Sequence, residues 1–232
     1  MVVHSAGNGA DPQSFDSFAL EYERFCGFED HPVWAWVAEA GVAPGGRALD
    51  AGCGSGRRCL ELAEHYDEVL GVDLSAPLVE LARARRPHPR VRYEVADLAD
   101  VDGGPEGFDL VFSSTTLHHV PDLDDALRKL KSLVRPGGSA VLVDNVADRP
   151  TPPAHVYRIG ALLSLPGDVR AHGWRDAAWL LRFRTGGPWL AHLLTDRYLS
   201  RPEFERRYGS IFPGATFVDR GFAHALVWRR DE

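Results

Sequence analysis

The sequence predicts an α/β fold with a doubly wound, mostly parallel sheet of seven strands, the last strand antiparallel, and a helical insertion. Between residues 47 and 145, short apolar runs alternate with helical patterns, which is typical of βαβ units. The first run, 47–50, ends in an acid and leads into glycines at alternate positions. Later runs at 68–73 and 91–96 are also closed by acids. Because the ends of parallel strands meet at one edge, these acids are expected to share one site.

The chain before the sheet is expected to form two helices. Residues 15–25 place apolar side chains on one side of a helix, namely Phe15, Phe18, Ala19, Tyr22 and Phe25. A second helix, 31–40, starts near a proline, which favours the first helical turn. Residues 1–14 are small and polar, and we expect them to be disordered.

The sheet region then follows a regular order. Apolar runs bounded by glycine or proline predict strands, and apolar residues at helical spacing predict helices. The expected strands are 47–50, 68–73, 91–96, 108–113 and 140–144, and the expected helices between them are 57–66, 77–86 and 122–133. Pro136-Gly137-Gly138 is expected to end the last of these helices and lead into the fifth strand.

The βα rhythm stops after residue 145. Helical patterns at 154–165, 176–184 and 189–194 fill an insertion of residues 146–200, which is rich in tryptophan, tyrosine and arginine. A last helix, 202–208, and a hairpin of strands 216–219 and 223–228 close the chain. We therefore expect one domain over residues 15–232, with N-terminal lid helices at 15–44 and a helical cap at 146–200.

Composition and charge limit the possible partners. The 232 residues carry a formal net charge of -7, which argues against nucleic acid because phosphate binding needs a basic surface. No apolar run approaches the length of a membrane helix, and the first ten residues lack the pattern of a signal peptide. Three cysteines are too few and odd in number for a disulfide framework. We expect a cytoplasmic protein without nucleic-acid or membrane partners; its oligomeric state is undecided, and a homodimer is possible.

The glycine turn carries the first functional signal. A dinucleotide-binding turn wants glycines at its first, third and sixth places, but the sixth place counted from Gly52 is Arg57. Asp50 beside the turn would repel a pyrophosphate and suit a positively charged ligand. These features oppose a nicotinamide oxidoreductase. The alternative is an ordinary glycine loop in another α/β protein.

Residues 49–56 resemble the first motif of class I S-adenosylmethionine-dependent methyltransferases, acid-x-Gly-x-Gly-x-Gly. The resemblance covers about 15–145 and 201–230, and it implies a Rossmann-like fold that binds S-adenosyl-L-methionine and releases S-adenosyl-L-homocysteine. The residues expected at the cofactor are Asp50, Gly52, Cys53, Gly54, Asp73, Leu74, Asp97, Leu98, Ser113 and Tyr22. Cys53 is expected mainly to pack within the turn.

Three of these residues have specific expected roles. Asp73 ends the second strand, where its carboxylate can accept both hydroxyls of a ribose; an N-cap role is less suited to it because Ser75 fits that position. The resemblance implies that Asp97 accepts the adenine amino group with help from the next backbone group, although Asp97 can instead cap a turn. It also implies that Tyr22 closes over the cofactor, while plain packing is the alternative.

The candidate catalytic residues follow the fourth strand. His118 and His119 lie where the transferred methyl group is expected, and an imidazole has a suitable pKa for a general base. In many relatives a histidine at this turn only packs or contacts the cofactor, so that role stays open. Three histidines of the insertion, including His192, are weaker choices. No His, Cys or Asp cluster shows ligand spacing along the chain, so we expect no metal.

The insertion is expected to bind the acceptor. Its candidate residues are Trp174, Trp179, Trp189, Tyr157 and Arg158, although the aromatic side chains can equally be core and the arginine can face solvent. The expected reaction is methyl transfer to a small or medium-sized organic acceptor, first on oxygen, then on nitrogen or carbon, with natural product biosynthesis as the expected setting. The alternative is a methyltransferase-like protein that binds the cofactor in a non-methylating role.

Overall fold

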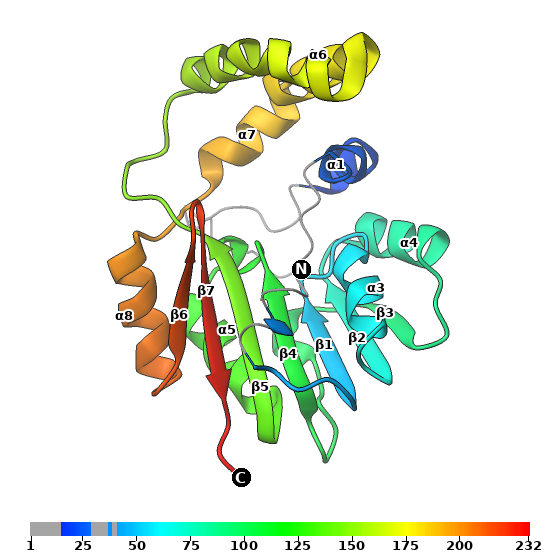
Figure 1. The fold of residues 1–232 in the computed structure, drawn as a ribbon, viewed down its shortest axis with the longest axis vertical. Coiled ribbons are helices and arrows are strands. Elements are labelled where there is room, and N and C mark those ends of the chain that lie inside the picture. The colour runs from blue at the N-terminus through cyan, green and yellow to red at the C-terminus, as the bar shows by residue number, and fades with distance from the viewer. Residues whose placement is uncertain (1–14, 29–36, 39–40) are drawn as a thin grey trace, which may run out of the picture.

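The computed structural model describes residues 15–28, 37–38 and 41–232. Its centre is a seven-stranded sheet in the order β3-β2-β1-β4-β5-β7-β6 (Figure 1). The strands are β1 (Arg47–Ala51), β2 (Glu68–Asp73), β3 (Val91–Val95), β4 (Phe108–Ser114), β5 (Val134–Asn145), β6 (Thr216–Arg220) and β7 (Ala223–Arg229). Strands β1 to β5 pair in parallel, whereas β7 pairs antiparallel with both β5 and β6. The predicted α/β sheet with an antiparallel last strand is confirmed.

Helices cover both faces of this sheet and its upper edge. They are η1 (Asp16–Phe18), α1 (Ala19–Cys26), α3 (Arg57–Ala63), α4 (Ala76–Arg85), η2 (Leu98–Asp100), η3 (Leu117–His119), α5 (Leu123–Leu133), α6 (Ala154–Thr185), α7 (Gly187–Thr195) and α8 (Arg201–Ile211). The disorder expected for 1–14 and all but two residues of the helix expected at 31–40 lie outside the described residues. Within the described ranges, no helix combines the length and apolar character that crossing a bilayer requires.

The largest differences from the predicted element bounds lie in the first insertion helix and the fifth strand. The prediction that the first insertion helix ends at residue 165 was wrong, because α6 runs on through Pro166. A proline removes one donor from a helix, but Leu162, whose carbonyl loses that bond, is 56% exposed and accessible to water. The helix instead changes direction at Gly173, whose φ of 79° lies in the region that glycine tolerates. Strand β5 begins at Val134, so Pro136-Gly137-Gly138 lies within the strand rather than before it.

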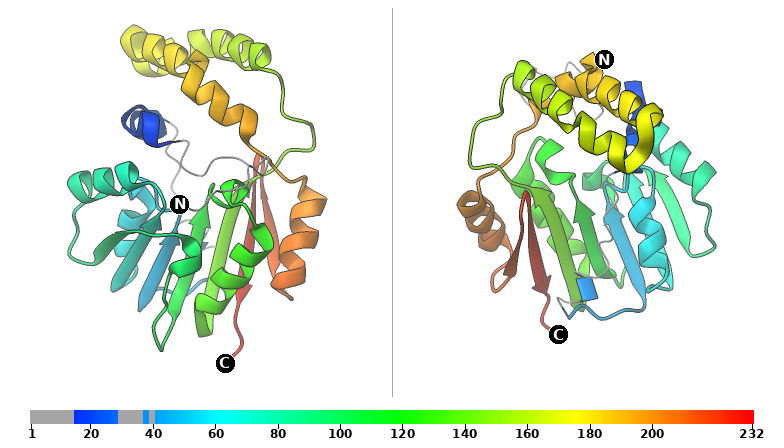
Figure 2. Two further views of the ribbon diagram at one scale, coloured as in Figure 1. Left: turned by 180° about the vertical axis from the view of Figure 1, so that it is seen from behind. Right: turned by 45° about the horizontal axis from the view of Figure 1, so that its top comes forward.

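The insertion stands above the carboxyl ends of the parallel strands. Figures 1 and 2 show α6 and α7 over this edge, with α1 lying between them and α4. An ion pair of 2.7 Å between Arg24 and Asp176 joins α1 to α6. The guanidinium of Arg24 also lies 4.1 Å from the ring centroid of Trp179. The N-terminal helix and the insertion therefore form one cover over the edge where open α/β sheets bind ligands.

Candidate functional site

The glycine turn after β1 contains one glycine needed for packing and one that faces open space. A Cβ on Gly52 would lie 2.2 Å from the Thr116 side chain, so that position has no room. A Cβ on Gly54 would meet none of the described atoms within 4 Å. Both residues have a positive φ, 80° and 51°, which favours glycine. Gly54 therefore presents bare backbone to an unfilled space beside the strand ends.

Asp73 lies next to that space. Its Oδ2 accepts a hydrogen bond of 2.8 Å from the Gly54 backbone N–H, and its Oδ1 accepts one of 2.9 Å from Ser75. A carboxylate offers about four acceptor positions, so acceptor capacity remains on both oxygens. Burial raises the pKa of Asp73, and the two backbone N–H groups oppose that rise. The arrangement suits a ligand with two neighbouring hydroxyl groups.

Other predicted cofactor residues support the turn from below. Asp50 is 1% exposed and accepts a hydrogen bond of 3.2 Å from the Cys59 thiol, and burial raises its pKa to about 7. Cys53 is buried, as expected for a packing residue. Ser113 is fully buried and donates its hydroxyl to the Ala51 carbonyl at 2.8 Å, which ties β4 to β1.

The remaining predicted cofactor residues lie at the next two strand ends. Asp97 is exposed and caps η2, because its Oδ1 accepts a hydrogen bond of 2.9 Å from the Ala99 N–H. One oxygen of this carboxylate thus performs the capping role that the sequence left open. Leu74 and Leu98 are half-buried beside Asp73 and Asp97. The predicted acids Asp50, Asp73 and Asp97 therefore lie at the carboxyl ends of β1, β2 and β3, in that order.

A buried carboxylate fixes α1 to the glycine turn. Glu23 accepts hydrogen bonds from the hydroxyl of Ser55, from Arg57 at 3.1 Å and from Arg86 at 2.6 Å. Its side chain is only 4% exposed. Burial tends to raise its pKa, but the hydrogen bonds from Ser55 and Arg86 outweigh that and lower it. The N-terminal helix is thus held beside the predicted cofactor loop by charge, a contact that the sequence analysis missed.

Tyr22 belongs to the opposite, aromatic side of α1. Its ring centroid lies 4.4 Å from Phe15 and 6.1 Å from Trp189, with which it is stacked. Burial is the main cause of its strongly raised pKa, and the charges of Asp73 and Asp196 add to it. Tyr22 therefore packs against the insertion through Trp189, and its role as a lid residue stays a prediction.

The first candidate base, His118, is paired with a second acid. Its Nδ1 lies 2.5 Å from Oδ1 of Asp144 at the end of β5. Burial lowers the pKa of His118, but the Asp144 carboxylate outweighs burial and raises it overall. Sequence patterns did not identify this partner, because an acid at the end of a fifth strand resembles the other strand-end acids.

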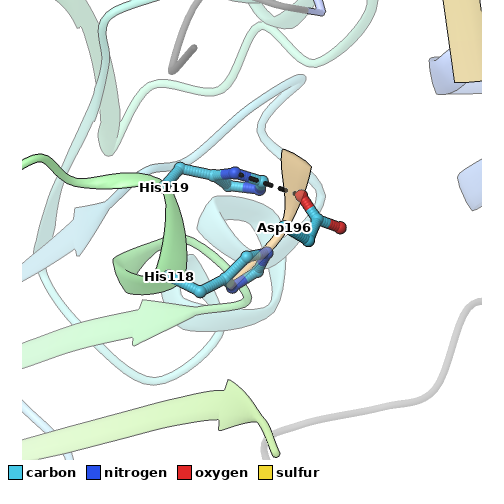
Figure 3. Close-up of side chains that lie close together, drawn as sticks. All are labelled: His118, His119 and Asp196. Carbon is cyan, nitrogen blue, oxygen red and sulfur yellow. Dashed lines mark ion pairs between the residues drawn. The ribbon is translucent and has the colours of Figure 1, made fainter. Parts of the chain in front are cut away.

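The second candidate, His119, lies in a different environment. Its ring meets that of Phe15 edge to face, with centroids 5.5 Å apart, and lies 5.0 Å from that of His192 on α7. Burial, followed by His118 and His192, lowers its pKa to about 2, so this imidazole stays neutral. Figure 3 shows His118 and His119 reaching from η3 toward Asp196, which follows α7. His119 Nδ1 and Asp196 Oδ1 are 3.7 Å apart.

A cavity of about 460 Å³ adjoins this group of side chains. It lies between the end of β5 and the insertion, and its lining includes Asn145, Pro150, Tyr157, Asp196, Tyr198 and Phe222. A volume of this size suits a small organic ligand. Of the predicted acceptor residues, Tyr157 lies in this lining.

The other predicted acceptor residues are distributed along the insertion. Trp189 packs against Tyr22 and His192, and Trp179 stacks on Phe183 with ring centroids 5.3 Å apart. Arg158 is exposed, and Trp174 is 74% exposed on α6. The structure therefore brings Trp189 to the lid and Tyr157 to the cavity, while Trp174 and Arg158 lie on the surface.

Comparison with known proteins agrees with this geometry. Residues 49–142 match a family model described as a methyltransferase domain. An O-methyltransferase of Penicillium expansum, cnsE, is 35% identical over 119 residues, which cover 49% of this chain and 43% of that protein. The malonyl-[acyl-carrier protein] O-methyltransferase of Salmonella typhimurium is 34% identical over 125 residues, which cover 54% and 49%. The chain thus spans about half the length of the curated relatives it matches.

Solved structures share the fold over nearly the whole chain. A methyltransferase in complex with the Haloferax volcanii Trm112 activator has a TM-score of 0.65 at 15% identity, over 96% of this chain and 99% of that one. The magnesium protoporphyrin IX methyltransferase of Synechocystis with bound S-adenosylmethionine has a TM-score of 0.59 at 17% identity, over 98% and 100%. At these identities the likeness concerns the fold alone.

The fold is Rossmann-like, and the strand-end acids gather at the switch point of the sheet, where open α/β sheets bind ligands. The family match over residues 49–142 then indicates the class, because together with this fold it supports a class I S-adenosylmethionine-dependent methyltransferase.

Proposed function

We propose that this protein transfers a methyl group from S-adenosylmethionine to a small or medium-sized organic acceptor, first on oxygen and otherwise on nitrogen or carbon. The observation that carries the proposal is the contact of Asp73 with Gly54, which leaves acceptor capacity on the carboxylate beside an unfilled space. Asp73 would hold the ribose, Asp97 with Leu98 the adenine, and the turn at Gly54 the amino acid end. When bound, the cofactor supplies an electrophilic methyl group.

The side chains above the sheet would prepare the acceptor. Methyl transfer needs the nucleophile in line with the methyl carbon and shielded from water. The cavity lined by Tyr157 and Tyr198 is large enough for such an acceptor, and the aromatic side chains of Tyr22 and Trp189 would exclude water from it. His118, paired with Asp144, would take the proton from an acceptor hydroxyl.

Oxygen is the first choice because two of the relatives above are named O-methyltransferases. We place the reaction in the cytoplasm and propose a natural product or other specialised metabolite as the acceptor. His119 is a weaker base than His118 because its pKa is lowered to about 2. A metal ion is not required for displacement at a sulfonium methyl group, which is already electrophilic.

The test measures transfer directly. The purified full chain is incubated with methyl-labelled S-adenosylmethionine and panels of phenols, carboxylic acids and amines, and product label and S-adenosylhomocysteine are quantified by mass spectrometry. We expect labelled product and S-adenosylhomocysteine in equal amounts, and loss of both with Asp73→Ala. Tight cofactor binding without either product, with cell extract as well as with the panels, would favour the non-methylating role.

A further inference from the structure

We propose that His118, His119 and Asp196 form a binding site for one divalent first-row transition metal ion, with Zn²⁺ as the first candidate and His192 as a further ligand. Each of the first three residues offers a ligand atom, and these atoms all lie within 4.8 Å of one another (Figure 3). The proposal does not rest on the proposed methyl transfer, because the residues of the predicted cofactor loop take no part in it.

The distances are those of ligands around one ion rather than of direct hydrogen bonds. His119 Nδ1 and His192 Nε2 each lie 3.7 Å from Asp196 Oδ1. Two ligand atoms about 2.1 Å from a tetrahedral ion are roughly 3.4 Å apart, whereas a hydrogen bond joins N and O at about 2.9 Å. A small contraction around an ion would bring the imidazoles of His119 and His192 and the carboxylate of Asp196 to ligand distance.

Two of these atoms lack any hydrogen-bond partner. His119 Nδ1 and Asp196 Oδ1 are both buried and unpaired in the described part of the chain, and their side chains are only 9% and 1% exposed. Buried polar atoms are normally paired, since leaving one unpaired is costly. The two unpaired atoms face each other across 3.7 Å, so one bound cation would satisfy both.

The charge of Asp196 also requires a partner. Its Oδ2 accepts a hydrogen bond of 2.6 Å from the Tyr198 hydroxyl, but none of the ion pairs among the described residues joins it to lysine or arginine. A buried carboxylate without a cation is strongly unfavourable. A water molecule between the unpaired atoms would satisfy their hydrogen bonds and leave that charge uncompensated, whereas a metal ion would do both.

The surrounding contacts are those of a metal centre. Metal-binding histidines usually donate their second ring nitrogen to a carboxylate, which fixes the ring. His118 does this through Nδ1 to Asp144 at 2.5 Å, which leaves its other nitrogen for an ion. Tyr198 holds the Asp196 carboxylate in the same way. Imidazole and carboxylate donors together suit Zn²⁺ and Fe²⁺, and less so Ca²⁺ or Mg²⁺, which prefer oxygen.

This site has a consequence for the proposed base. An ion on the available nitrogen of His118 would prevent that atom from accepting a proton. In the metal-bound protein, an acceptor hydroxyl that entered the coordination sphere would instead be acidified by the ion itself. The cavity wall includes Asp196 and Tyr198, so an acceptor there lies next to the proposed ion.

The test uses the purified full chain, stripped with a chelator and dialysed into metal-free buffer. Zn²⁺ is titrated by calorimetry with a competing chelator, and Co²⁺ is followed by its visible absorption. The variants are Asp196→Asn, which keeps the side-chain shape, and His119→Ala. The matched control is His155→Ala, which removes an exposed histidine on α6.

We expect one ion per chain for the unaltered protein and for His155→Ala, with an affinity reduced more than about 100-fold in Asp196→Asn and His119→Ala. The absence of stoichiometric Zn²⁺ and Co²⁺ binding, or unchanged affinity in Asp196→Asn, would overturn the site. S-adenosylhomocysteine titrations on the same samples report folding. The same titrations also distinguish the two proposals. If the unaltered protein fails to bind S-adenosylhomocysteine, the result counts against methyl transfer and not against the metal site.

Discussion

Two regions of the molecule are built from similar residues but differ in their electrostatic conditions. One is the sheet edge that carries the predicted cofactor loop. The other is the junction between η3 and the insertion. At the loop, the half-buried carboxylate of Asp73 is paired with two backbone N–H groups. At the junction, Oδ1 of the buried Asp196 carboxylate accepts no hydrogen bond from any described residue, and it lies opposite His119 Nδ1, which likewise has no hydrogen-bond partner among them. The first carboxylate is completed by the protein itself, whereas the second needs a further group.

This difference shows how the two regions are specified. Backbone N–H groups at a glycine turn are placed by the strand and helix on either side, so the loop is formed whenever the sheet forms. The junction combines η3, the end of β5 and the segment after α7, and none of these elements alone creates it. The loop is therefore expected to tolerate changes in the insertion, while the junction is expected to depend on it.

The largest expected effect comes from filling the loop. Gly54→Val should abolish S-adenosylmethionine binding, because the added side chain would occupy the open space beside Asp73. The matched control is Gly214→Val, since Gly214 also has a positive φ, of 77°, and open space, but lies in the turn after α8. Calorimetric titration and thermal melts measure binding and folding. Normal binding by Gly54→Val would show that the loop does not face the ligand.

A smaller loss is expected from removing the carboxylate at the loop. Asp73→Ala should weaken S-adenosylmethionine binding by about 1.5–3 kcal/mol, the scale of charge-assisted hydrogen bonds. Asp100→Ala is the control, because Asp100 is an exposed acid in nearby η2. If both variants bind the cofactor equally well with intact melts, Asp73 does not hold the ribose.

The junction is expected to set the pH dependence of turnover. A general base must be neutral, and Asp144 raises the pKa of His118 above 6.5, so kcat/KM should fall as the pH drops through that raised pKa. Asp144→Asn should move this acidic limb to lower pH, because it removes the charge that raises the pKa of His118, with exposed Asp148→Asn as the control. Profiles are recorded on metal-stripped protein. An acidic limb that stays in place would exclude His118 as the titrating base.

The smallest expected effects compare two tryptophans of the insertion. Trp189→Ala should lower acceptor turnover by up to about tenfold, because Trp189 stacks on Tyr22 and an aromatic pair contributes roughly 0.5–1.5 kcal/mol beyond its buried area. Trp174→Ala should change turnover and melting little, since that side chain is 74% exposed. Trp179→Ala, which removes the stack on Phe183, should fall between them.

These tryptophan variants also test whether the insertion is a cap or part of the core. Cofactor affinity should remain nearly unchanged in all three, because the predicted cofactor contacts other than Tyr22 on α1 lie at the strand ends of the sheet. A fully buried tryptophan would instead cost about 3–5 kcal/mol of stability on truncation. If all three variants unfold the protein, or if Trp189→Ala turns over normally, the insertion does not cover an acceptor in the way proposed.

The sequence by itself determined the sheet and its loop. Strands and helices appear as local periodicities in the sequence. Asp50 and Gly54 lie at one turn, and Asp73 follows one helix and one strand later, so a single βαβ unit brings the three residues together. Every strand was predicted, with bounds that moved mainly at β5, where a glycine-rich segment is held in the sheet by its neighbours. Local signals were enough because each contact spans only one supersecondary unit.

Only the tertiary structure decided the groupings that join distant segments. Asp144, Asp196 and Glu23 gave no signal of their partners, because the chain between partners has no fixed periodicity. The expectation of no metal used spacing along the chain, and such spacing does not detect a group of side chains drawn from η3 and the segment after α7, where the metal site is proposed. Likewise, the sequence did not distinguish Trp189, which stacks on Tyr22, from Trp174, which is exposed, because both are tryptophans of the same aromatic-rich insertion. Packing of the insertion on α1 settled these positions, since side-chain direction depends on what a helix covers.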